Sequence, residues 1–148
     1  MSLQDQITEQ LKVAMKAKDT VALESLRAIK SAILLAQTQA GAKDLNSDDE
    51  IKLVQKLVKQ RKDSAEIFRQ QGRVDLAEPE EAQIMIIEQF LPEQLDEDAI
   101  AAQIDIIITK TGAAGMKDMG KVMGMASKEM AGKADGKTIS SIVRQKLS

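Results

Sequence analysis

The sequence GAAGMKDMGKVMG occupies residues 112–124, and GKADGK follows it at residues 132–137. Six of the chain's eight glycines lie between residues 112 and 147, together with seven basic and three acidic residues. The local charge of +4 (seven minus three) contrasts with the net charge of −2 of the whole 148-residue chain. A basic, glycine-rich module at the end of an acidic chain indicates a surface for a polyanion.

The composition excludes several classes of site. The chain has no cysteine and no histidine, so disulfides, thiolate and imidazole chemistry and the ordinary zinc ligands are absent. We therefore expect no cofactor and no metal. No apolar run approaches the ~20 residues of a membrane helix. The N-terminal MSLQDQ lacks the features of a signal peptide, so we expect a cytoplasmic location and no membrane partner.

Apolar residues recur at helical spacing along the chain, separated by capping residues and glycines, which predicts an all-α fold. We expect an N-terminal bundle of about four helices at residues 1–92 and a small C-terminal three-helix domain at residues 93–148. The run from Ile104 to Thr109 is β-branched enough for a strand. No second strand is available to pair with it, so a helix is predicted there.

Local patterns also predict where individual helices begin. Ser47, followed three residues later by Glu50, predicts a capping box at the start of the third helix. The sixth helix is expected to run from Met116 or Lys117 to Met130. Asp135 is expected to cap the seventh helix.

The sixth predicted helix carries a set of residues that we name the C-terminal lysine row: Lys117, Lys121, Gly124 and Lys128. At 100° per residue these positions share one side of the helix, opposite a side of methionine, valine and alanine. A glycine among lysines lets a backbone approach closely, as a sugar-phosphate contact requires. A solvated face with a glycine kept for helix packing explains the row equally well, because lone lysine rows are common.

The GKADGK loop favours the binding interpretation. It adds two lysines beside a helix start, where free N–H groups favour phosphate. We therefore predict nucleic-acid contacts at the C-terminal lysine row and at this loop, through Lys117, Lys121, Gly124, Lys128, Lys133, Asp135, Gly136 and Lys137.

The third predicted helix carries a second set of cations, named here the central basic row: Lys52, Lys56, Lys59, Lys62, Arg69 and Arg73. Alone, such a row is more typical of a solvated face than of a binding site. Arg61 lies instead within the apolar side of this helix, as Glu80 does on the fourth helix. Because an unpaired buried charge is costly, we predict a structural ion pair between Arg61 and Glu80. Glu81 and Glu88 are the alternative partners.

Catalysis by this chain alone has little support in the sequence. The P-loop pattern and the dinucleotide-binding glycine fingerprint are both missing. Ser140 and Ser141 precede Lys146, but they begin a short helix without a nucleophile elbow. No catalytic residue is predicted.

Several short motifs together resemble the YqeY-like (GatB/YqeY) family. They are LRxxKSA at 26–32, KQRKDS at 59–64, GRxDLA at 72–77, LP at 91–92, MGKVM at 119–123 and GKADGK at 132–137. The resemblance covers nearly the whole chain. Gln83 and Phe90 depart from the Glu and Tyr that are more common in the family.

The resemblance implies an N-terminal helical bundle joined to a small tail. That tail is similar to the C-terminal domain of the B subunit of the tRNA-dependent amidotransferase, which contacts tRNA away from the catalytic domain. The implied function is a non-catalytic accessory protein that binds tRNA or a tRNA-like RNA. One alternative is an accessory component of a carbon–nitrogen ligase with glutamine as amido-N-donor, with an amidotransferase as protein partner. Another is a helical protein–protein interaction module that uses the central basic row or Met125.

Overall fold

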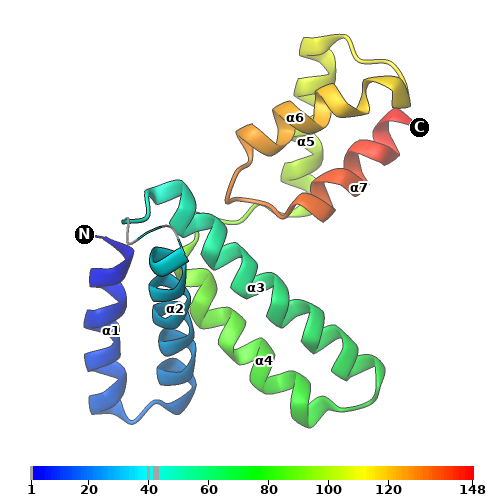
Figure 1. The fold of residues 1–148 in the computed structure, drawn as a ribbon. Coiled ribbons are helices and arrows are strands. Elements are labelled where there is room, and N and C mark those ends of the chain that lie inside the picture. The colour runs from blue at the N-terminus through cyan, green and yellow to red at the C-terminus, as the bar shows by residue number, and fades with distance from the viewer. Residues whose placement is uncertain (1, 40, 42–43) are drawn as a thin grey trace. The chain divides into compact units, whose positions relative to one another are not determined.

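The computed structural model describes residues 2–39, 41 and 44–148, and all regular secondary structure among these residues is helical (Figure 1). The all-α prediction is confirmed. The chain divides into two compact units, Met1–Leu91 (unit 1) and Pro92–Ser148 (unit 2). Each unit has its own hydrophobic core, so each is described by itself.

Unit 1 consists of two helical hairpins (Figure 1). The first pairs α1 (Leu3–Ala17) with α2 (Thr20–Gln39), and the second pairs α3 (Ser47–Gln70) with α4 (Val74–Ile87), followed by the 3-10 turn η1 (Glu88–Phe90). Contacts between α2 and α4 join the hairpins. The core is aliphatic: Leu3, Ile7, Ala14, Leu26, Ile29, Ile33, Val54, Val58, Ile84 and Ile87.

The start of α3 differs from the sequence prediction by one residue. Asn46, not Ser47, is the N-cap: its side-chain oxygen accepts from Asp49 N at 2.8 Å, and Asp49 Oδ2 accepts from Asn46 N at 3.4 Å. Glu50 is thereby free for another contact, and its Oε2 accepts from the N–H of Leu3 at 3.2 Å. The capping box thus begins one residue earlier than predicted, and Glu50 joins the start of α1 to α3 through a hydrogen bond.

Unit 2 consists of three helices with one 3-10 turn. They are α5 (Glu97–Thr111), η2 (Met116–Asp118), α6 (Met119–Glu129) and α7 (Gly136–Leu147). Asp96 caps α5 by accepting from Ala99 N at 2.7 Å. The β-branched run from Ile104 to Thr109 lies inside α5, so the choice of helix for this run is confirmed.

The three helices of unit 2 meet at an aliphatic core that includes Ile104, Val122 and Val143, all with 0% exposure. Fully burying one such side chain contributes about 1.5–3 kcal/mol.

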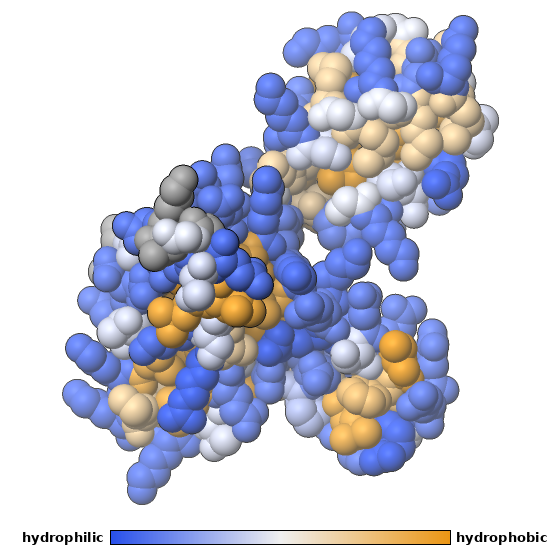
Figure 2. Space-filling model, viewed as in Figure 1, coloured by the Kyte–Doolittle hydropathy of each residue, from blue (hydrophilic) through white to orange (hydrophobic). Residues whose placement is uncertain are grey.

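The viewed face of the molecule is largely hydrophilic, with separate hydrophobic groups between the polar side chains (Figure 2). In the part of the chain that the structure describes, no helix is long and apolar enough to cross a membrane.

Candidate nucleic-acid interface

The C-terminal lysine row is divided between two elements. Lys121, Gly124 and Lys128 lie on α6, but Lys117 lies in η2, so the prediction of one helix from Met116 or Lys117 to Met130 is wrong at its start. The reason is local. Gly112 ends α5 with φ +68° and Gly115 follows with φ +82°, while Asp118 Oδ2 accepts from the N–H of Ala114 at 2.8 Å. This turn holds the chain out of the α-helix until Met119.

All five predicted lysine contacts have exposed side chains: Lys117, Lys121, Lys128, Lys133 and Lys137. Among the residues that the structure describes, the ion pairs join other cations, so none of these five lysines is neutralised by a carboxylate. Of the three acids in the same region, Asp118 and Asp135 accept from the backbone N–H groups of Ala114 and Thr138, and Glu129, next to Lys128, takes part in none of the ion pairs of the described residues. The lysine charges are therefore available to an external anion.

Neither the packing nor the backbone conformation of unit 2 requires the two glycines of α6. Gly120 and Gly124 are exposed, neither has a positive φ, and a Cβ added at either would meet no described atom within 4 Å. Packing against a neighbouring helix of this unit therefore does not explain Gly124. Each glycine destabilises a helix interior by about 0.5–1 kcal/mol relative to alanine. The main chain of α6 is consequently open to close approach along the same helix as Lys121 and Lys128.

The loop between α6 and α7 is held in place by the segment that follows Pro92. The amide Nε2 of Gln94 donates to Gly132 O at 2.7 Å, and Leu95 N donates to Lys133 O at 2.8 Å. These bonds fix the backbone at Lys133 while its side chain stays exposed. Sequence analysis did not identify Gln94, because its partner lies 38 residues away and no local pattern signals such a contact.

Asp135 has a structural task at the start of α7. Its Oδ1 accepts from Thr138 N at 2.7 Å, which confirms that it caps the helix. A carboxylate there adds negative charge and occupies one of the helix-terminal N–H donors. Asp135 is therefore a helix cap. Gly136 and Lys137 remain the candidates for the predicted phosphate contact at the start of α7. Gly136 is exposed, with no described atom within 4 Å of an added Cβ.

The central basic row is largely neutralised over its second half. Arg69 forms a bidentate pair with Glu81 at 2.6 and 3.0 Å, Arg73 pairs with Asp75, and Lys62 lies 3.2 Å from Glu88. The hydrogen bond from Arg69 lowers the pKa of the Glu81 carboxyl, and the bond from Arg73 lowers the pKa of Asp75. These cations hold α3 against α4 or close the turn between them.

The predicted ion pair between Arg61 and Glu80 does not form among the described residues. Arg61 Nε donates to Gln83 Oε1 at 2.9 Å and its Nη1 donates to Leu57 O at 3.2 Å. Gln83 Nε2 donates in turn to Glu24 Oε2 at 3.2 Å. The expected meeting of α3 and α4 at Arg61 is correct, but the register places an amide opposite the guanidinium. A polar chain thus joins α3, α4 and α2.

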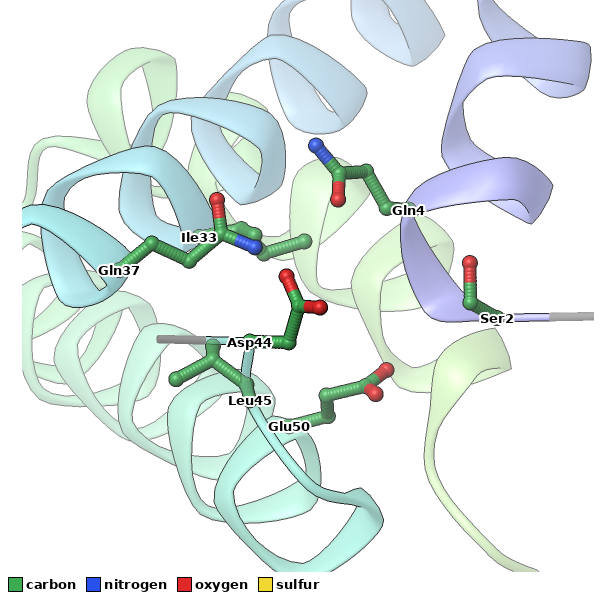
Figure 3. A pocket seen from close by; sticks show the side chains of 7 residues that line it. All are labelled: Ser2, Gln4, Ile33, Gln37, Asp44, Leu45 and Glu50. Carbon is green, nitrogen blue, oxygen red and sulfur yellow. The ribbon is translucent and has the colours of Figure 1, made fainter. Parts of the chain in front are cut away.

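Unit 1 also has a pocket of about 240 Å³ between the start of α1, the end of α2 and the start of α3 (Figure 3). Its lining combines carboxylates, amides, a hydroxyl and two apolar side chains: Ser2, Gln4, Ile33, Gln37, Asp44, Leu45 and Glu50. None of these described lining residues offers a cation to a phosphate. Within the described part of the chain, no group of three acidic side chains is placed to hold a metal ion.

A family model described as Yqey-like protein matches residues 4–147. The chain belongs to this family. A protein from Pyrenophora tritici-repentis named altered inheritance of mitochondria protein 41, mitochondrial, is 32% identical over 131 residues, covering 84% of this chain and 68% of the relative. The protein of the same name from Lachancea thermotolerans is 40% identical over 57% of this chain, and the match spans 46% of that relative.

A further relative of this Yqey-like protein is the E subunit of glutamyl-tRNA(Gln) amidotransferase from Thermococcus gammatolerans. It is 30% identical over 105 residues, which cover 68% of this chain but only 17% of the relative. The match therefore links this chain to a small part of a much longer protein. The expected cytoplasmic location stays a prediction, because relatives carry mitochondrial names.

Proposed function

We propose that this Yqey-like protein is a non-catalytic accessory protein that binds tRNA, or an RNA of similar structure, through unit 2. The observation that carries the proposal is the set of five exposed lysines without carboxylate partners: Lys117, Lys121, Lys128, Lys133 and Lys137. Lysine ammonium groups bind phosphate as point charges, so they position RNA without reading its sequence.

The kind of RNA follows from what unit 2 offers. The two aromatic residues of the chain, Phe68 and Phe90, both belong to unit 1. Unit 2 thus has no aromatic side chain on which unpaired bases would stack, which disfavours single strands. Exposed lysines and an open main chain at Gly124 suit the phosphate backbone of a folded RNA.

A filter-binding titration of the full chain with tRNA at several salt concentrations tests this proposal. Each phosphate contact should contribute about 0.7–0.9 to the negative slope of log K against log salt. Five lysine contacts therefore predict a slope of about −3.5 to −4.5. Absent or salt-independent binding would remove the proposal. The 260/280 nm absorbance ratio of the purified protein is a second readout, because the chain has no Trp or Tyr.

A second candidate function is an accessory role in a carbon–nitrogen ligase that takes glutamine as amido donor. The similarity to a relative named as the E subunit of glutamyl-tRNA(Gln) amidotransferase favours it. This role predicts co-purification with a glutaminase and faster amide formation on mischarged tRNA when the chain is added. Binding of tRNA without either effect would leave the RNA-binding proposal in place and exclude this second one.

A helical protein-interaction module has less support. Met125 is half-buried and packs against the core of unit 2, and three cations of the central basic row are engaged in ion pairs. A nuclease-resistant complex with a protein, free of RNA, would favour this alternative.

A further inference from the structure

Helix α7 carries cations with two different environments. Lys146 Nζ lies 2.8 Å from Asp105 Oδ1, and its side chain is 28% exposed, so it holds α7 against α5. Arg144 is exposed and takes part in none of the ion pairs of the described residues. It is the one arginine in the sequence of unit 2, and residues 136–147 contain no acidic residue. Nothing on its own helix neutralises Arg144.

The position of Arg144 matches the pattern on α6. Lys137, Ser141 and Arg144 stand at i, i+4 and i+7 on the side of α7 away from the buried residues Ile139 and Val143. At 1.5 Å per residue, the Cα atoms of Lys137 and Arg144 are about 10.5 Å apart along the helix. Lys121 and Lys128 on α6 have the same spacing of seven residues. Helices α6 and α7 pack against each other. Each of these neighbouring helices therefore carries two exposed cations that are seven residues apart.

We propose that Arg144 is a further phosphate-binding residue, and that the RNA-contacting surface extends from α6 along the α7 row of Lys137, Ser141 and Arg144. The inference rests on the proposed function. A guanidinium binds a phosphate through two parallel hydrogen bonds, which a lysine cannot do. Arg144 is thus the contact that fixes the orientation of a phosphate, where the five lysines supply charge. The competing explanation is a cation that only stabilises the C-terminal end of α7.

Two substitutions distinguish these explanations. Arg144→Gln should reduce the negative salt slope of tRNA binding by ~0.7–0.9 and weaken binding about five- to eight-fold at 0.1 M salt. Arg144→Lys should retain the slope, because the charge remains, yet bind more weakly than the native protein, because the paired hydrogen bonds are lost. Lys146→Gln is the matched control. It removes a cation from the same helix, but this cation already has a carboxylate partner within the protein.

A stabilising role alone would lower the melting temperature of Arg144→Gln and leave its salt slope equal to that of the native protein, which overturns the inference. If Arg144→Gln does not fold, the comparison of Arg144→Lys with the native protein decides: equal affinity overturns the inference. If Lys121→Gln weakens binding and neither Arg144 variant does, the inference fails while the proposed function stands. If the native protein binds no tRNA, both fail.

Discussion

The two lysine-rich rows of this chain resemble each other in sequence and differ in their surroundings. On α3 and the turn that follows it, the row is interspersed with acids such as Asp63 and Glu66, and its second half is paired with carboxylates. On η2 and α6, Lys117, Lys121 and Lys128 are exposed and have no such pairs in the described structure. The spacing of cations alone does not distinguish a binding surface from a structural one.

The difference follows from where each helix has a neighbour. Helix α3 packs along α4, which offers Glu81 and, just beyond its end, Glu88 to the cations on that side. Helix α6 buries its side of Val122 and Ala126 in unit 2 and leaves the opposite side to solvent. Cations of like charge on one helix repel one another, and the proposed function assigns the exposed lysines of this row to an external anion.

The largest effect is expected from removing charge from the C-terminal lysine row. The double variant Lys121→Gln/Lys128→Gln should reduce the negative salt slope of tRNA binding by about 1.4–1.8 and weaken binding about 25- to 60-fold at 0.1 M salt. Filter binding over a range of salt concentrations measures both quantities. The thermal stability should remain close to that of the native protein, because both side chains are exposed and unpaired.

The matched control is Lys52→Gln/Lys56→Gln, which removes the same charge from two exposed residues in the first half of α3. We expect a much smaller change in binding, limited to the long-range loss of positive charge. Equal losses of affinity in the two double variants would contradict the distinction between the rows. They would indicate that net charge, rather than the surface of unit 2, governs binding.

A smaller effect, on stability alone, is expected from Gln83→Leu in the polar chain of unit 1. The substitution removes the acceptor of Arg61 Nε and the donor to Glu24. It should lower the free energy of unfolding by about 1–2 kcal/mol, because Arg61 is half-buried and loses a partner. Urea denaturation measures this change, with the exposed Gln60→Leu as control. A change in tRNA affinity would show that the cations of α3 act beyond the fold.

Gly124→Ala should have effects of opposite sign on stability and on binding. The position is helical and open, so alanine should raise the free energy of unfolding by about 0.5–1 kcal/mol. If an RNA backbone approaches α6 there, the added methyl group weakens binding while stability rises. Denaturation and filter binding on one preparation measure both. Unchanged affinity would limit the contact to the lysine side chains.

The sequence was sufficient for the fold class because helical periodicity and helix ends are local. Asp135 capping α7 is an example, since the cap and its N–H lie three residues apart. Local patterns did not identify the correct cap where two adjacent residues could each begin a capping box. Asn46 with Asp49 and Ser47 with Glu50 both fit a capping box, and a contact from Glu50 to Leu3, 47 residues away, accompanies the first.

The register between helices is the other limit. The helical wheel places Arg61 on the buried side of α3 but does not specify which residue of α4 faces it. The bidentate pair of Arg69 with Glu81 fits a register in which Arg61 meets Gln83 in place of Glu80. The exposed lysines have no such partner to misassign. The helical wheel correctly places Lys121 and Lys128 on the exposed side of α6, but it does not show whether they bind RNA.

The smallest expected effect concerns pH and separates the two rows once more. The pKa of Glu81 in the folded chain lies below its ordinary value of 4.5, chiefly because Arg69 donates a hydrogen bond to it. The pair should therefore contribute stability at neutral pH and lose it as the pH falls below about 4.5 and through the folded-state pKa. The melting temperature of the native protein should exceed that of Glu81→Gln slightly at pH 7, and the difference should vanish in acid. The effect is small because the pair is exposed.

Lys121→Gln should show no such pH-dependent difference, since Lys121 has no carboxylate partner, and a difference like that of Glu81→Gln would contradict the assignment of a free lysine row.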